Sequence, residues 1–339
     1  MKEIQSYQAH KQEGILLNAN ELSNNLNEQI KKEIQERIPE VLFNRYPEEP
    51  VTKLFDSYAQ VLGCQANQLM AGNGSDQMLG YLIGTFLGAG KKAYTISPDF
   101  GMYDYYCSSY DADIEKYPTK EDGSFDIEDF IRVGKEKDVN LVLFSNPNNP
   151  TGHALSKEEV LTIVRGFDCP VIVDEAYMEF YGESVFDEVE NFDNLYVTRT
   201  LSKAFGLAGI RCGFLISASE RIAKLKANFV PYALNRLTQE VAIIVLSHAK
   251  EFEESTAQIC QERDAMYGAL KELKKIQVYP SKANFLYGKC ANKEALLSLF
   301  EKENVVIRDY AGKDTFRITI GSKDENKRVL DILNTFEGE

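Results

Sequence analysis

The chain has 339 residues, of which 44% are hydrophobic and 27% charged, a composition that excludes a disordered or fibrous protein. At this length we expect two domains, or one large domain with a smaller partner. The formal net charge of −14 argues against binding to nucleic acid or anionic membrane, because both need a basic face, and it favours small-molecule partners.

Cysteine and histidine usage narrows the chemistry further. The six cysteines show no C-x-x-C spacing, and the three histidines lie far apart in the sequence. We therefore expect no metal site and no serine–histidine nucleophile. The first residues lack an apolar signal segment, and no stretch reaches the roughly 18 apolar residues of a membrane span. These features predict a cytoplasmic protein.

Short apolar runs alternate with helical periodicity from about residue 65 to 216, which predicts an α/β fold. Near-continuous hydrophobic runs are typical of parallel strands covered on both faces, and they occupy residues 92–96, 140–144, 170–174, 194–198 and 212–216. Helices are expected at residues 75–87, 126–136 and 156–167, the last opening on a Ser-x-x-Glu capping box.

Beyond about residue 230 the pattern changes to long charged helices followed by short strands. We predict a large domain at residues 41–232 and a smaller α+β domain at residues 233–339. The segment 1–40, which contains an amphipathic stretch near residues 25–38, is predicted to pack on the smaller domain.

Ligands of open α/β sheets bind at the carboxyl ends of the strands, and the polar motifs of this chain follow predicted strands. The first, "AGNGSDQ" at residues 71–77, opens a helix, so the backbone N–H groups around Gly74 and Ser75 can cradle a phosphate. It is not a dinucleotide fingerprint, because Gln77 stands where a third glycine or alanine is needed. A simple helix N-cap at Ser75 is the alternative interpretation.

Two further motifs follow the next strands. "SNPNNPTG", residues 145–152, is turn-like, and its two X-Pro bonds raise the chance of a cis peptide that fixes a side chain such as Asn149. "VIVDEAY", residues 171–177, places Asp174 at a strand tip and Tyr177 three residues later. A buried carboxylate needs a cation or donors, so Asp174 is either a helix N-cap or the partner of a protonated ring nitrogen.

The segment "TRTLSKAFGLAGIRCGF", residues 198–214, brings Lys203 to another strand tip, with Arg211 eight residues later. A lone Ser-Lys pair is usually a surface feature, but a desolvated lysine amine is the nucleophile of Schiff-base chemistry. Pyridoxal phosphate would use all these parts at once. It has an aldehyde for Lys203, a ring nitrogen for Asp174, a phenolic oxygen for Asn149 and Tyr177, and a phosphate for Arg211 and the 73–75 amides.

These motifs, together with "FRITIG" at residues 316–321, resemble the fold-type-I pyridoxal-phosphate aminotransferases of class I and II. Within them the resemblance is closest to the histidinol-phosphate aminotransferases, and it extends from "LNANE" at residues 17–21 to "VIRD" at residues 306–309. It therefore covers nearly the whole chain. The family implies a large domain built on a mostly parallel seven-stranded sheet between helices, and a smaller α+β domain.

The resemblance also implies a role for each site residue. Lys203, Asp174 and Tyr177 would be the catalytic residues. Lys203 would carry the cofactor as a Schiff base and then move a proton, Asp174 would stabilise the pyridinium, and Tyr177 would hydrogen-bond the ring oxygen. The other cofactor contacts it implies are Gly74, Ser75, Asp76, Phe100, Asn149, Tyr177, Thr200, Ser202 and Arg211. Tyr46 would reach the cofactor phosphate of the other subunit of a homodimer. Asn20, Tyr103, Arg308 and Arg317 would contact the substrate.

The implied reaction is transamination from L-histidinol phosphate, or a related amino donor, to a 2-oxo acid such as 2-oxoglutarate. Three alternatives stay open. They are an aminotransferase for aromatic or other amino acids, a threonine-phosphate decarboxylase of the same fold, and a non-enzymatic regulatory module that only binds the cofactor.

Overall fold

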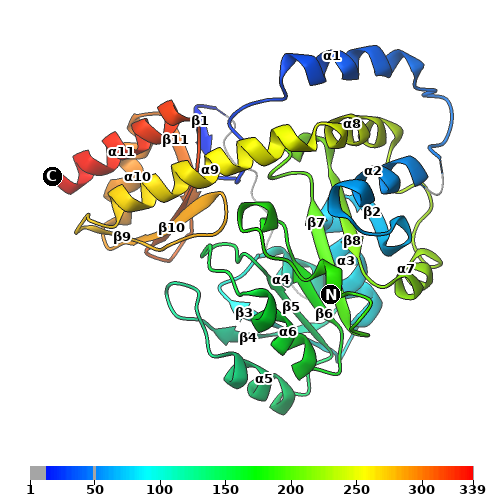
Figure 1. The fold of residues 1–339 in the computed structure, drawn as a ribbon. Helices are drawn as coiled ribbons and strands as arrows, with labels where there is room; N and C mark the ends of the chain where they lie inside the picture. The colour runs from blue at the N-terminus through cyan, green and yellow to red at the C-terminus, as the bar shows by residue number, and fades with distance from the viewer. Residues whose placement is uncertain (1–12, 49–50, 339) are drawn as a thin grey trace.

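The structure is a computed structural model that describes residues 13–48 and 51–338. It is built on two sheets (Figure 1). The larger sheet has seven strands in the spatial order β2 (Leu69–Asn73), β8 (Cys212–Ile216), β7 (Leu195–Thr200), β6 (Val171–Asp174), β5 (Leu141–Ser145), β3 (Lys92–Ser97) and β4 (Asp113–Pro118). Strand β8 runs antiparallel to both of its neighbours, and the other pairs are parallel. The five predicted strands and the mostly parallel seven-stranded sheet are confirmed, but the strand at residues 212–216, expected to be parallel, is antiparallel. It is hydrophobic throughout because it too is buried on both faces.

Helices cover both faces of this sheet, which explains why its strands are hydrophobic without alternation. One face packs against α2 (Thr52–Leu62), α5 (Ile127–Glu136), α6 (Lys157–Gly166) and α8 (Arg236–Ser247). The other packs against α3 (Ser75–Phe86), α4 (Met102–Ser109) and α7 (Ser219–Lys226). Along β5, Val142 and Phe144 belong to the first core, whereas Leu141 and Leu143 belong to the second. The three predicted helices are α3, α5 and α6, and the capping box of Ser156 and Glu159 is present.

The smaller sheet has five strands in the order β1 (Ile15–Leu17), β11 (Val305–Asp309), β12 (Thr315–Thr319), β10 (Phe285–Cys290) and β9 (Ile276–Val278). Its core is completed by α9 (Ala249–Leu270), α10 (Lys293–Lys302) and α11 (Lys323–Gly338). In Figure 1 the long helix α9 runs from the end of α8 across to this smaller sheet.

The N-terminal segment packs partly on the smaller sheet and partly on the helices that cover the larger sheet. Strand β1 pairs in parallel with β11 of the smaller sheet. Helix α1 (Glu28–Arg37) instead lies along α8, as Figure 1 shows. The apolar side chains of α8, including Val241 and Val245, belong to the core of the larger sheet. The domain boundary between residues 232 and 233 stays a prediction. The packing of α8 on the larger sheet favours a boundary between the two domains after α8.

In the part of the chain that the structure describes, no helix has both the length and the apolar character needed to cross a membrane. The six cysteines form no disulfide.

Candidate active site

The carboxyl ends of β5, β6 and β7 open into a cavity of about 310 Å³. Ten of the predicted site residues line it. They are Ser75, Asp76, Phe100, Asn149, Asp174, Tyr177, Thr200, Ser202, Lys203 and Arg211. Residues from 19 to 211 in the sequence therefore meet at one point, as expected where parallel strands end together.

Asp174 ends β6 and is 3% exposed. Its Oδ1 accepts a hydrogen bond from Thr198 Oγ1 at 2.9 Å, and its Oδ2 accepts one from the Tyr103 hydroxyl at 3.1 Å. No lysine, arginine or histidine within residues 13–48 and 51–338 forms an ion pair with it. Burial raises the pKa of Asp174 to about 6, against the opposing effect of these hydrogen bonds. The carboxylate is thus buried, held by hydrogen bonds, and not paired with a cationic side chain of the described residues.

Lys203 follows β7, and its Nζ donates to the backbone oxygen of Ala19 at 2.8 Å. Burial lowers the pKa of Lys203 to about 8, and the positive charge of Arg317 adds to this effect. The amine also lies 6.0 Å from the centre of the Tyr177 ring. A lysine with a pKa near the working pH is a competent nucleophile and proton carrier.

The wall of the cavity next to α3 could hold an anion. Ser75 begins α3, and Gly74 precedes it with a φ of +80° that favours glycine. A Cβ atom on Gly74 would lie 2.7 Å from Arg211 Nη2, so glycine also leaves room for that guanidinium. Arg211 itself adopts a left-handed backbone conformation with φ of 57°, which aims its side chain at Asp76 Oδ2, 2.7 Å away.

Hydroxyl groups complete this anion site. Thr200 Oγ1 donates to Ser202 Oγ at 2.9 Å and accepts from the backbone N–H of Ser202 at 3.1 Å. The first N–H groups of α3 carry the partial positive charge of a helix N-terminus. Together they form the kind of cradle that binds phosphate.

A second cavity of about 360 Å³ adjoins the first and shares Ala19, Phe100, Asn149, Tyr177 and Lys203 with it. It is also lined by Asn20, Arg308 and Arg317. Arg317 is 6% exposed, and its guanidinium donates to Asn149 Oδ1 and, at 2.8 Å, to the backbone oxygen of Asn18.

Arg317 could bind an anion. Its Nε has no hydrogen-bond partner in the described part of the chain, and it forms no ion pair with a described carboxylate. Asn20 Nδ2 donates to the Tyr177 hydroxyl at 2.8 Å, which ties the N-terminal segment to the wall that both cavities share. Burial raises the pKa of Tyr177 to about 12.

Two predicted residues lie elsewhere. Tyr103, which we expected beside the substrate, is 1% exposed and sits beneath the cavity against Asp174. The reason is that it is the second residue of α4, and its side chain packs into the core on that face of the sheet. Tyr46 is 82% exposed, stacks on Tyr232 with ring centres 4.8 Å apart, and lines neither cavity. Its predicted contact with a second subunit stays a prediction.

Several site residues were missed by the sequence reasoning. Thr198 of β7 and Ser145 of β5 lie directly beside Asp174 in the register of these parallel strands. Aligning the ends of the predicted strands could therefore have identified both residues. Asp99 accepts hydrogen bonds from the backbone N–H groups of Phe100 at 2.7 Å and Ser145 at 3.2 Å. Burial raises the pKa of Asp99 to about 7. Nothing in the sequence indicated that Ala19 would accept a hydrogen bond from Lys203.

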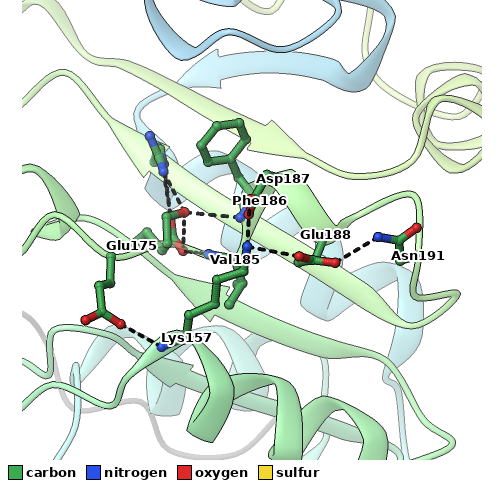
Figure 2. A network of polar contacts seen from close by, with 10 residues as sticks. Lys157, Glu175, Val185, Phe186, Asp187, Glu188 and Asn191 are labelled. Atoms are coloured by element: carbon green, nitrogen blue, oxygen red, sulfur yellow. Dashed lines mark hydrogen bonds and ion pairs between the residues drawn. The ribbon is translucent and has the colours of Figure 1, made fainter.

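A buried ion pair supports the segment after β6. Arg199 Nε donates to Glu175 Oε2 at 2.9 Å, and Glu175 Oε1 accepts from the backbone N–H of Val185 at 3.0 Å. In Figure 2, Glu175 faces Val185, while Lys157 reaches across from α6 to Asp187 and Glu188. These contacts fix the start of the loop that carries Tyr177.

Comparisons with known proteins agree with this geometry. The family model for class I and II aminotransferases matches residues 12–333. The histidinol-phosphate aminotransferase of Clostridium novyi is 33% identical over 100% of this chain and 96% of its own length. The solved histidinol-phosphate aminotransferase of Clostridium acetobutylicum is 26% identical with a TM-score of 0.86, covering 96% of this chain and 99% of its own. The enzyme of that name from Sinorhizobium meliloti, solved in complex with pyridoxal 5′-phosphate, is 20% identical with a TM-score of 0.85 and covers 96% and 92%.

Proposed function

Because the chain belongs to the class I and II aminotransferases, we propose that it is a pyridoxal-phosphate-dependent transaminase that moves an amino group from L-histidinol phosphate to 2-oxoglutarate. One observation carries the proposal. A lysine with a lowered pKa, a buried carboxylate without a cation and an anion cradle at a helix N-terminus line the same cavity.

The residues present fit the cofactor. Asp174 would hold the proton of its ring nitrogen, which would give the buried carboxylate the cation that it lacks. Arg211 and the first N–H groups of α3 would bind its phosphate, and Phe100 would lie against its ring. When bound, pyridoxal phosphate supplies an aldehyde and a ring that withdraws electrons from the carbon bearing the amino group.

The chain's own residues supply binding and proton transfer. Lys203 Nζ, with its pKa near 8, would anchor the cofactor and then carry a proton from the substrate carbon as a general base. Arg317, which lines the second cavity, would bind a substrate carboxylate through its guanidinium group. Arg308 would bind the phosphate of the donor from the same cavity.

Two arginines in one cavity favour a donor and an acceptor that are both anionic. The names of the relatives favour histidinol phosphate among such donors. An aromatic amino acid donor would bring no phosphate for Arg308 to bind. A decarboxylase would release carbon dioxide and form no 2-oxo product.

The test is a panel of amino donors scored by glutamate formed from 2-oxoglutarate. We expect histidinol phosphate to give a higher kcat/KM than histidinol, phenylalanine or tyrosine. Arg308→Ala should remove the preference for the phosphorylated donor over histidinol, while a change of the exposed Lys302 to Ala leaves it unchanged. Equal rates with histidinol and its phosphate would contradict this substrate, and carbon dioxide release would favour the decarboxylase.

The assembly is part of the same proposal. Exposed apolar side chains lie in the Tyr46 loop, in α4 and in the loop before α8, and they are Leu42, Phe43, Tyr46, Tyr105, Tyr110, Val230 and Tyr232. Exposed large apolar side chains are typical of interaction faces when they lie together. We infer a homodimer in which Tyr46 reaches the partner's cofactor site. The free cysteines support a cytoplasmic location, where thiols stay reduced.

A further inference from the structure

Asp99 lines the second cavity but not the first, and the chemistry proposed above gives it no role. Its Oδ1 accepts hydrogen bonds from the backbone N–H of Phe100 at 2.7 Å and from the Ser145 hydroxyl. Its Oδ2 accepts from the backbone N–H of Ser145 at 3.2 Å and from the Thr95 hydroxyl at 3.3 Å. A carboxylate has about four acceptor positions, so the protein itself occupies this one fully.

These bonds join the ends of two neighbouring strands, β3 and β5. The register between the two strands pairs only two residues of each and ends at Tyr94 and Val142. Beyond that point β3 continues to Ser97 and β5 to Ser145. The backbone N–H of Ser145 bonds to the side chain of Asp99 and not to the backbone of β3. Asp99 therefore connects the two strands at the edge of the sheet where the cavities open.

Ser145 extends this connection to the turn after β5. Its hydroxyl donates to Asp99, and its Oγ accepts from the backbone N–H of Asn149 at 3.0 Å and from Asn148 Nδ2 at 3.4 Å. Phe100 follows Asp99 directly in the chain. One carboxylate thus holds the backbone of Phe100 and, through Ser145, the backbone of Asn149, and both residues line the first cavity.

We propose that Asp99 is a positioning residue of the cofactor site, whose carboxylate sets the spacing between Phe100, at the face of the cofactor ring, and Asn149, at its phenolic oxygen. This inference rests on the proposed function, to which both of those roles belong. Asp99 acts through the two residues without touching the cofactor. Contacts to the face and the edge of a planar ring work together only when the supporting residues keep their spacing.

The test is the affinity of the cofactor-free protein for pyridoxamine 5′-phosphate, measured by isothermal titration calorimetry. This form of the cofactor has no aldehyde, so it binds without a bond to Lys203. The titration is run about one unit above the pKa of Asp99, which burial raises to about 7, so that the carboxylate is ionised. Asp99→Asn keeps the shape but places an N–H group where the carboxylate accepts. We expect the affinity to fall at least about fivefold, the factor that one lost hydrogen bond gives.

Ser145→Ala breaks the same connection at its other end and should also weaken binding. Because both variants act through one connection, the double variant should bind no more than about twofold more weakly than the weaker single variant. Tyr94→Phe is the matched structural control. It deletes a buried hydroxyl of β3 that donates to the backbone oxygen of Phe130 at 3.1 Å, outside both cavities. It should lower the melting temperature and leave the affinity unchanged.

Hydrogen exchange gives a readout that does not depend on the cofactor. The Asn149 amide of the cofactor-free protein, followed by nuclear magnetic resonance, should exchange faster in Asp99→Asn and Ser145→Ala but not in Tyr94→Phe. Equal affinity in the wild type and Asp99→Asn would overturn the proposal, and so would losses in Asp99→Asn and Ser145→Ala that multiply in the double variant.

If Asp99→Asn does not fold, Ser145→Ala decides. An unchanged affinity in that variant overturns the proposal, and a lower affinity together with faster exchange at Asn149 supports it. Wild-type protein that does not bind pyridoxamine 5′-phosphate at all would instead contradict the proposed cofactor, and this role of Asp99 with it.

Discussion

Asp174 is buried and forms no ion pair with a cationic side chain of residues 13–48 and 51–338, and burial raises its pKa to about 6 from an ordinary value of 3.8. Between these two pH values the folded protein binds the proton more often than the unfolded chain does. The ionised carboxylate therefore lowers the free energy of unfolding of the cofactor-free protein, and this penalty reaches its full size above pH 6. This penalty disappears as the pH falls to 3.8. If Asp174 binds the cationic ring nitrogen of the cofactor, as proposed, binding of the cofactor relieves this penalty.

From this we predict that Asp174→Asn raises the free energy of unfolding of the cofactor-free protein at pH 7 by up to about 3 kcal/mol, the upper limit set by the difference between the two pKa values. The gain should vanish below about pH 4. Urea unfolding at the two pH values measures it. Asp56→Asn, an exposed change on α2, is the control and should alter stability by less than about 0.5 kcal/mol. A loss of stability in Asp174→Asn at pH 7 would contradict this account.

The pKa of Lys203 leads to a second prediction about a single residue. Burial lowers its pKa from 10.5 to about 8, and only the neutral amine reacts with an aldehyde. The rate at which the cofactor-free protein binds pyridoxal phosphate should therefore rise with pH and level off above about pH 8. Stopped-flow absorbance measures this rate. A rate that still rises near pH 10 would mean that Lys203 has the pKa of a solvated lysine.

At the scale of elements, the approach of β8 to the start of α3 shapes the anion cradle. A Cβ atom on Gly213 would lie 2.0 Å from the backbone nitrogen of Ser75 and 2.3 Å from the carbonyl carbon of Gly74. Contacts this short with backbone atoms cannot be relieved by a side-chain rotation. Only glycine lets the strand pack directly beneath the turn that presents the first N–H groups of the helix.

We predict that Gly213→Ala lowers the free energy of unfolding by about 1 to 3 kcal/mol, as overpacking does, and weakens the binding of pyridoxal phosphate. Cofactor titration followed by absorbance, together with urea unfolding, tests both effects. Gly88→Ala is the matched control, because a Cβ atom there meets nothing within 4 Å. Equal cofactor affinity in the two variants would show that the cradle does not depend on this approach.

The elements also show where sequence reasoning stops. Buried strands such as β5 and β6 could be predicted because they are hydrophobic throughout. Strand β4 could not, because it lies at the edge of the sheet and its residues "DIEKYP" are mostly exposed or half-buried. The position of Tyr103 depends on how α4 packs on the sheet, and local patterns carry no information about that packing.

At the scale of the whole molecule, the site draws on both sheets. Arg317 comes from β12 of the smaller sheet, and Asn20 lies in the segment just after β1, whereas Lys203 and Asp174 come from the larger sheet. The motifs identified the residues of the larger sheet from strand-end chemistry. The arginines of the smaller sheet were predicted only through the family resemblance, because distant segments meet there by tertiary packing.

The proposed homodimer makes a prediction at this scale. If Tyr46 serves the partner's site, Tyr46→Ala homodimers should bind the cofactor more weakly, and Lys203→Ala homodimers should be inactive. Dissociating and reassembling the two variants together should restore activity, because one site of each mixed dimer receives an intact Lys203 and an intact Tyr46. Analytical ultracentrifugation verifies the dimer. Activity in the mixture no greater than the average of the two variants would contradict the exchange of Tyr46.

The proposed covalent anchoring of the cofactor by Lys203 is the claim on which the other proposed roles in the site depend. It is tested most directly by borohydride reduction of the cofactor-loaded protein, followed by proteolysis and mass spectrometry of the peptides. We predict that the mass added by the reduced cofactor appears on the peptide that contains Lys203, and that Lys203→Ala protein carries none. An adduct on a different lysine, or no adduct in the wild-type protein, would contradict the account.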